Sequence, residues 1–306
     1  MNRRNFSKSL MGGAALGVTG LAQAGQVSST TSTEAPYNLS VMLWTVFRNL
    51  PFEQRMEKVV EAGYKQIELV GEYKKWSEAD FKRAIAKQKE LGITFDVTAG
   101  LKRGVGNPGD RDGLLSDVRN ELPIMQRIDC PAVIIMSGNV VPGMPRETQH
   151  QSCIEGLKRA AGLVEGKQIN GQPVRLLLEN IDPEENPKYY LTSVAEGFEV
   201  IRAVNHPQVK LLYDFFHEQI AEGNLIEKLK KNIDYTGLVH IADVPGRHIP
   251  GTGEINYDNI YKTLADLNYK HTVAMEFIPI GDPVEELRRA KEQALRTGRR
   301  KATNTL

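Results

Sequence analysis

The sequence predicts an α/β fold, a single (β/α)8 TIM barrel. Short apolar runs alternate with amphipathic segments eight times between residues 37 and 300. That span of about 260 residues is the usual size of such a barrel. Each of the last four apolar runs carries an acid or a histidine at or near its carboxyl end. No glycine-rich phosphate-binding fingerprint follows the first run, which argues against a doubly wound dinucleotide-binding sheet.

The amino terminus is predicted to be an export signal that precedes the barrel. A twin arginine, Arg3-Arg4, comes before a weakly apolar stretch at 10–21, and Ala22-Gln23-Ala24 offers a small-residue cleavage site. This pattern resembles a cleavable twin-arginine (Tat) signal over residues 1–24, followed by a Ser/Thr-rich spacer at 25–36. We therefore expect a periplasmic protein; the alternative is a basic tail that happens to precede an apolar segment.

Composition narrows the choice of partners. The 306 residues have a formal net charge of +1, which gives no reason to expect nucleic acid as a partner. No apolar run is long enough for stable membrane insertion. The two cysteines, Cys130 and Cys153, are expected to be free, buried thiols. The sequence leaves the oligomeric state open, with a homo-oligomer among the alternatives.

The first four strand-helix units follow from apolar runs and helix-end signals. The first helix ends at Gly63, as glycine at a helix carboxyl end predicts. Ser77 and Asp80 form a capping box at the start of the second helix. Pro123 is expected to kink or break the third. The expected strands are 40–45, 66–69, 94–98 and 132–136, and the expected helices are 51–62, 77–90, 110–127 and 148–168.

The last four units follow the same pattern. The final helix is expected to begin with Asp282 as its cap and Pro283 at its first position. The expected strands end at residues 179, 214, 241 and 276, and the expected helices are 193–204, 224–232, one around residues 260–267 and one from 282 onward.

Four side chains at the ends of these last strands form the candidate site. In a (β/α)8 barrel, the carboxyl ends of the strands meet at one rim, where active sites are built. Glu179, Asp214, His240 and Glu276 come from four consecutive strands, so their side chains can meet there. Three carboxylates and one imidazole suit one divalent ion, Mn²⁺ first, with Mg²⁺ or Co²⁺ as alternatives. A single acid at the end of a strand commonly caps the next helix and binds no metal. Because all four residues stand at the same place in their strands, a shared site is the favoured interpretation.

Part of the chain resembles the xylose isomerase-like TIM barrels, which include hydroxypyruvate isomerases and the tagatose and psicose 3-epimerases. The resemblance is carried by Tyr213-Asp214-x-x-His217 and by the stretch from His240 to Tyr257, with Arg247 and a Pro-Gly-Thr-Gly-Glu-Ile-Asn-Tyr run. It implies that the four rim residues bind a divalent metal and that Glu179 and Glu276 also move protons. It implies as well that His217 and Arg247 contact the substrate's oxygens.

The chain departs from the hydroxypyruvate isomerase pattern in two places. It has Glu179-Asn180-Ile181-Asp182 where the isomerase usually has Glu-Pro-Ile-Asn. It has His240 where the isomerase usually has glutamine, and histidine is the epimerase form. The resemblance therefore implies an enzyme of this family but leaves its exact substrate open.

The expected reaction is a metal-assisted isomerisation. Shifting a carbonyl between adjacent carbons needs a proton removed from one carbon and returned to its neighbour through an enediolate, whose charge a chelating metal stabilises. We assign Glu276 as the first base and Glu179 as its partner, each contributing about 10²- to 10⁴-fold. The expected substrate is hydroxypyruvate, converted to tartronate semialdehyde. The alternative is a ketose 3-epimerase, or another isomerase or lyase acting on an oxidised sugar.

The sequence also bears on two other functions. The abasic-site nucleases that share this barrel need several more histidines and a basic groove, which neither the histidine distribution nor the charge provides. An exported sugar- or metal-binding barrel without turnover stays open.

The sequence allows more than one interpretation of three further residues. Glu68 reaches a substrate hydroxyl, or forms a helix cap or rim salt bridge. Trp44 forms a pocket wall or packs in the core. Glu185 binds a sugar hydroxyl or is a solvated loop acid.

Overall fold

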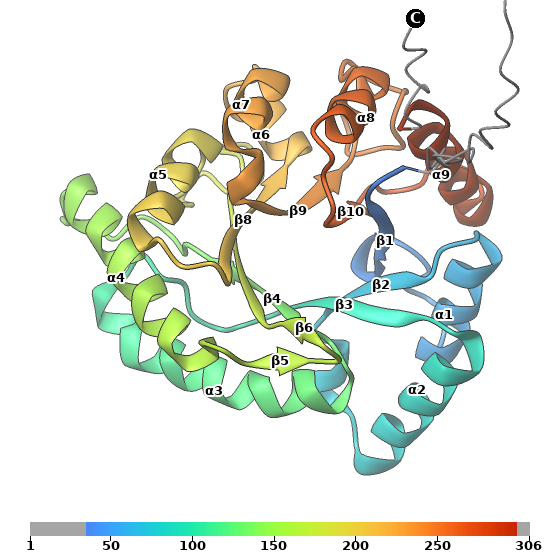
Figure 1. Ribbon diagram of the computed structural model, residues 1–306, viewed down its shortest axis with the longest axis horizontal. Coiled ribbons are helices and arrows are strands. Elements are labelled where there is room, and N and C mark those ends of the chain that lie inside the picture. The colour runs from blue at the N-terminus through green and yellow to red at the C-terminus, as the bar shows by residue number, and fades with distance from the viewer. Residues whose placement is uncertain (1–34, 299–306) are drawn as a thin grey trace, which may run out of the picture. The chain divides into compact units, whose positions relative to one another are not determined.

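A computed structural model of the chain describes residues 35–298, with a closed barrel of parallel strands at the centre and helices around it (Figure 1). The strands follow one another around the barrel in the order β1-β10-β9-β8-β7-β4-β3-β2. They are β1 (Asn38–Met42), β2 (Gln66–Val70), β3 (Thr94–Ala99), β4 (Ala132–Met136), β7 (Arg175–Glu179), β8 (Val209–Asp214), β9 (Thr236–Ile241) and β10 (Thr272–Met275). The predicted TIM barrel is confirmed.

The helices cover the outside of the barrel. They are α1 (Phe52–Glu61), α2 (Glu78–Leu91), α3 (Arg111–Arg127), α4 (Arg146–Val164), α5 (Val194–Val204), α6 (Phe215–Ala221), α7 (Leu225–Asn232), α8 (Tyr257–Asp266) and α9 (Pro283–Thr297). Within residues 35–298, none of them is both long and apolar enough to cross a membrane. The predicted signal at 1–24 and most of the spacer lie outside the described residues.

Helix-end signals in the sequence match the structure. The Ser77 hydroxyl accepts a hydrogen bond from the Asp80 amide, and the Asp80 carboxylate accepts one from the Ser77 amide, so the predicted capping box is present. The Asp282 carboxylate accepts from the Glu285 amide at 2.9 Å, with Pro283 in the first turn. Such caps satisfy amide groups that have no partner inside the helix.

Three features differ from the prediction. A two-stranded antiparallel hairpin, β5 (Gln168–Ile169) and β6 (Gln172–Pro173), follows α4, where a helix was predicted to extend to residue 168. Helix α6 starts directly after β8, whereas no helix was predicted between residues 214 and 224. Pro123 lies inside the continuous helix α3 and does not break it, because this exposed position lets solvent satisfy the carbonyl that proline leaves unpaired.

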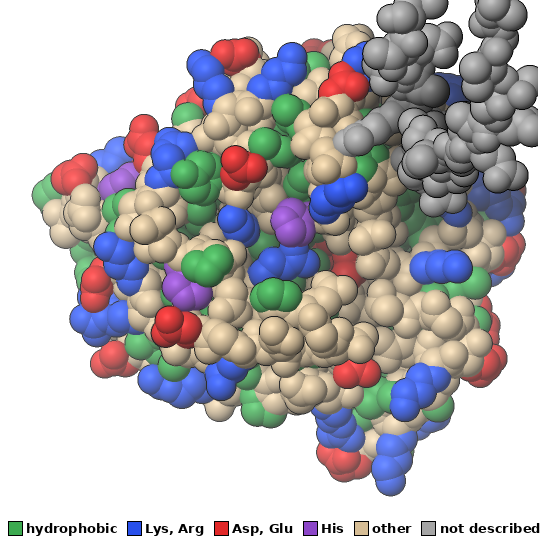
Figure 2. Space-filling view, in the orientation of Figure 1, with side chains coloured by type: hydrophobic (Ala, Val, Ile, Leu, Met, Phe, Trp, Pro, Cys, Tyr) green, Lys and Arg blue, Asp and Glu red, His purple; other side chains and the backbone are tan. Residues whose placement is uncertain are grey.

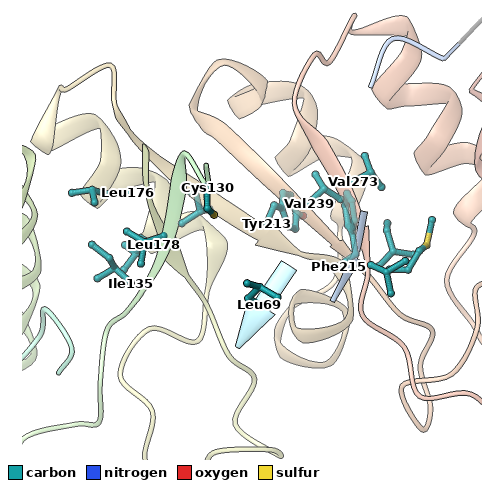
Figure 3. Packing of buried hydrophobic residues seen from close by; sticks show 14 of the residues in the cluster. Leu69, Cys130, Ile135, Leu176, Leu178, Tyr213, Phe215, Val239 and Val273 are labelled. Atoms are coloured by element: carbon teal, nitrogen blue, oxygen red, sulfur yellow. The ribbon is translucent and has the colours of Figure 1, made fainter. Parts of the chain in front are cut away.

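The core has two layers that follow from the alternation of side chains along each strand. Within β7, Leu177 packs inside the barrel with residues such as Leu212 and Leu238, while Leu176 and Leu178 belong to the layer between strands and helices. Figure 3 shows part of this outer layer. Its members include both cysteines, which are buried and free as predicted. Packing on both faces fixes the strands, and with them the side chains at the rim.

Candidate active site

The four predicted ligands lie together at the carboxyl end of the barrel. Glu179 ends β7, Asp214 ends β8, His240 is in β9, and Glu276 follows β10. These strands are neighbours in the barrel, and Asp214 pairs with His240 across β8 and β9. All four side chains are buried, and each offers one ligand atom that lies within 4.8 Å of the other three.

The geometry of this cluster fits a divalent cation. His240 Nδ1 lies 2.7 Å from Glu276 Oε2, 3.8 Å from Glu179 Oε1 and 3.9 Å from Asp214 Oδ2. The shortest approach lacks hydrogen-bond angles, so His240 Nδ1, Glu276 Oε2 and Asp214 Oδ2 are buried without a hydrogen-bond partner among the described residues. Unpaired buried polar atoms are costly and rare. A small cation coordinated by oxygen and nitrogen would satisfy all three at once.

The two glutamates of the cluster have different electrostatic surroundings. Burial raises the pKa of Glu179 to about 8, although nearby His240 acts in the opposite direction. Burial also acts to raise the pKa of Glu276, but the charges of Arg247 and His240 outweigh burial and hold that pKa well below its usual range. Two carboxyl groups whose pKa values are moved apart can take the roles of acid and base at one pH.

The two oxygens of the Asp214 carboxylate have different surroundings. Its Oδ1 accepts hydrogen bonds from the Phe216 and His217 amides, at 2.7 and 3.1 Å, and so caps helix α6. Its Oδ2 faces the cluster. The helix-cap reading and the ligand reading of this acid are therefore compatible.

Arg247 lies against the cluster. It adopts a positive φ of 58° and is buried. Its Nη2 is 2.8 Å from Glu276 Oε2, and its Nη1 donates to the Glu185 carboxylate at 2.9 Å. The guanidinium also lies 4.9 Å from the centre of the Phe216 ring. These contacts fix a permanent positive charge beside Glu276.

His217 is part of the same network. Its Nδ1 lies 2.5 Å from Asp182 Oδ2, and its Nε2 lies 3.5 Å from Arg247 Nη1. Burial lowers the pKa of His217, but the charge of Asp214 and the hydrogen bond to Asp182 overcome that effect and raise it to about 9. Asp182 stands at one of the positions where the sequence departs from the isomerase pattern, and it is fully buried.

The structure shows the contacts of the three further residues whose sequence positions allowed more than one interpretation, Trp44, Glu185 and Glu68. Trp44 Nε1 donates to Glu276 Oε1 at 2.6 Å, so this side chain is a polar partner of the site as well as an apolar surface. Glu185 is exposed but holds Arg247, so it is more than a solvated loop acid. Glu68 is fully buried, and its Oε2 lies 2.9 Å from His240 Nε2. In the sequence, the signal for Glu68 is that an acid stands in an otherwise apolar strand.

A hollow lies at the end of the barrel opposite the cluster. It has a volume of about 360 Å³, and its lining includes Asn38, Gln66, Thr94, Arg175 and Thr272, which stand at the amino-terminal ends of the strands. In TIM barrels this end serves stability, and the opposite rim carries the chemistry.

On the face shown in Figure 2, blue basic and red acidic side chains are interspersed.

A TIM barrel whose carboxyl-terminal rim gathers three buried carboxylates and a buried imidazole has the form of an enzyme with a candidate metal centre. The chain belongs to the xylose isomerase-like TIM barrel family, whose profile matches residues 56–297. The family resemblance inferred from sequence motifs is confirmed.

Named relatives and solved structures agree with this family assignment. The chain is 31% identical over 255 residues to a 2-oxo-tetronate isomerase of Haemophilus influenzae, covering 82% of this chain and 95% of that protein. It is 29% identical over 250 residues to the hydroxypyruvate isomerase of Escherichia coli, covering 78% and 93%. A crystal structure described as an AP endonuclease, family 2, from Brucella melitensis matches with a TM-score of 0.74 at 26% identity, covering 82% and 96%. The named isomerases support isomerase activity for this chain.

Proposed function

We propose that this protein is a divalent-metal-dependent isomerase that shifts a carbonyl between adjacent carbons of a short hydroxy-carbonyl acid, with hydroxypyruvate and tartronate semialdehyde as its substrate pair. The observation that carries the proposal is the convergence of Glu179, Asp214, His240 and Glu276 within 4.8 Å. The similarity to hydroxypyruvate and 2-oxo-tetronate isomerases supports the substrate class, because both compounds are 2-oxo acids with a hydroxyl on carbon 3.

The four clustered residues would hold the ion. Three carboxylates and one imidazole favour Mn²⁺, with Mg²⁺ and Co²⁺ as alternatives. When bound, such an ion supplies positive charge against the negative charge that develops on the substrate's oxygens.

The protein's own groups supply the proton transfers in this proposal. Glu276 is held ionised by Arg247 and is assigned as the first base. Glu179 approaches from the β7 side and is assigned as the acid that returns a proton to the neighbouring carbon. Arg247 and His217 are assigned to the substrate's oxygens, since both present nitrogen atoms beside the cluster.

A single assay tests the reaction. The purified protein, loaded with Mn²⁺, is incubated with hydroxypyruvate in deuterated water, and product and carbon-bound deuterium are followed by NMR. We expect tartronate semialdehyde, with deuterium exchange that stops when a chelator removes the ion. Absence of both with hydroxypyruvate and with 2-oxo-tetronate would contradict the proposal.

His240 favours one second candidate, a ketose 3-epimerase, because the resemblance gives histidine as the epimerase form at this position. An epimerase uses the same two carboxylates but returns the proton to the carbon from which it came. Testing D-psicose and D-tagatose in the same assay as hydroxypyruvate and 2-oxo-tetronate distinguishes an epimerase from an isomerase. Turnover of a ketose, without turnover of either 2-oxo acid, would favour the epimerase.

We also propose that the chain is exported to the periplasm by the twin-arginine route, on the motif at Arg3-Arg4. The double substitution Arg3→Lys and Arg4→Lys should leave the protein in the cytoplasmic fraction. The control is Lys8→Arg, which keeps the arginine pair. Fractionation followed by immunoblotting reads out the location, and export of the double variant at the wild-type level would contradict this proposal.

A further inference from the structure

Glu68 and His240 form a buried pair across the barrel. Glu68 is in β2 and His240 in β9, strands that are separated in the barrel by β1 and β10. Both residues are 0% exposed. Glu68 Oε2 lies 2.9 Å from His240 Nε2, with hydrogen-bond geometry. The carboxylate therefore contacts the candidate ligand from the side away from the other three ligands.

This contact decides which ring nitrogen of His240 faces the cluster. An ionised carboxylate only accepts hydrogen bonds, so the proton of the pair lies on Nε2. The other nitrogen, Nδ1, is the one that lies 2.7 Å from Glu276 and 3.9 Å from Asp214. A histidine binds a metal through a nitrogen lone pair, and the hydrogen bond made by the other nitrogen fixes both the tautomer and the ring orientation.

We propose that Glu68 is a positioning residue that accepts the Nε2 proton of His240 and thereby turns the Nδ1 lone pair toward the metal position. This inference rests on the proposed function, because it needs a divalent ion at the cluster. Of the interpretations made from the sequence, it keeps the salt bridge, now with His240 as the partner, and replaces the substrate contact and the helix cap. A fully buried Glu68 cannot reach a substrate hydroxyl in the open rim, and its partner is a ligand and not a helix end.

The burial of the second carboxylate oxygen of Glu68 supports a role for this residue in orienting His240. Oε1 is buried and has no hydrogen-bond partner among the described residues. A carboxylate kept in the barrel interior for packing alone would cost stability, since a hydrophobic side chain of similar size avoids that desolvation. The contact with His240 gives a reason for an acid at this position.

The test compares three variants. Glu68→Leu removes the acceptor and keeps a side chain of similar size. Glu68→Gln keeps one oxygen that can accept from Nε2. Asp96→Asn is the matched control, because Asp96 is a buried acid of the adjacent strand β3 that accepts from the Ser40 hydroxyl and makes no contact with His240. Mn²⁺ binding is measured by electron paramagnetic resonance of the free ion, and the His240 nitrogens are observed by ¹⁵N NMR.

The expected result is a graded loss of metal affinity. Loss of the partner of a metal-ligating histidine weakens binding by about 10- to 100-fold, which we expect for Glu68→Leu, with Glu68→Gln in between and Asp96→Asn within about 2-fold of wild type. With Zn²⁺ bound, wild-type His240 should show a proton on Nε2 and none on Nδ1.

Two results would overturn the inference while leaving the proposed function intact. They are wild-type metal affinity in folded Glu68→Leu, or an Nε2 without a proton in the Zn²⁺-bound wild type. If Glu68→Leu does not fold, Glu68→Gln and the wild-type NMR spectrum still decide. Failure of the wild type itself to bind a divalent ion is a different outcome, and it would overturn the metal-dependent function together with this inference.

Discussion

Replacing Glu276 by glutamine is expected to lower kcat by about 10²- to 10⁴-fold, the usual contribution of a positioned general base. Glutamine has nearly the same size, so the barrel should still fold. It has no negative charge, however, and one of its two terminal atoms is an amide nitrogen. In the wild type, the Trp44 N–H donates to Oε1 at 2.6 Å, and the Arg247 guanidinium lies 2.8 Å from Oε2. The amide nitrogen of glutamine would face one of these two donors. The base is lost and its surroundings are left with unpaired donors.

The measurement must separate lost proton transfer from lost metal, because Glu276 is assigned to both. Steady-state kinetics with hydroxypyruvate are run at saturating Mn²⁺, and metal content is measured on the same sample. Glu285→Gln, at an exposed acid in the first turn of α9, is the control and should keep wild-type kcat. A metal-loaded Glu276→Gln enzyme that keeps more than about a tenth of kcat would contradict the assignment of Glu276 as base.

Local sequence patterns are sufficient to predict the barrel and the positions of the four clustered residues at its rim. Runs such as Leu176-Leu177-Leu178 are apolar on both faces, as strands of a parallel sheet are, and their number and spacing define the closed topology. In that topology the rim positions follow from the chain alone. Glu179 and Asp214 end their strands, so their convergence requires only that β7 and β8 are neighbours.

The partners of these residues could not be predicted, because they come from elements far apart in the sequence. Glu68 and His240 are 172 positions apart, and Trp44 and Glu276 are 232 apart. Each contact depends on the tilt of the strands and on side-chain rotamers across the barrel. The hairpin β5–β6 is too short for periodicity to reveal. Helix α6 is seven residues long and begins with Phe215 and Phe216, so in the sequence these two residues read as a continuation of the apolar run of β8.

The second large effect is expected at Asp214, where one side chain serves a helix and the candidate metal centre. Aspartate has two oxygens, and the structure uses Oδ1 as the cap of α6 and aims Oδ2 at the cluster. Asparagine has only one oxygen and is as good an N-cap as aspartate. We therefore expect Asp214→Asn to stay within about 0.5 kcal/mol of wild type in the free energy of unfolding, while its Mn²⁺ affinity falls by about 100-fold or more.

Asp214→Ala removes both functions and completes the comparison. Its metal affinity should fall as in the asparagine variant, and its metal-free form should lose about 0.5 to 2 kcal/mol of stability, the cost of losing a cap. Ser193→Ala is the matched control, because Ser193 caps α5 through the Ala195 amide and has no contact with the cluster. It should lose a similar amount of stability and bind Mn²⁺ normally. Urea unfolding of the metal-free proteins and Mn²⁺ titration measure the two quantities. Normal Mn²⁺ affinity in Asp214→Asn would mean that this acid only caps the helix, because a side chain with a single oxygen cannot hold the helix amides and the ion together.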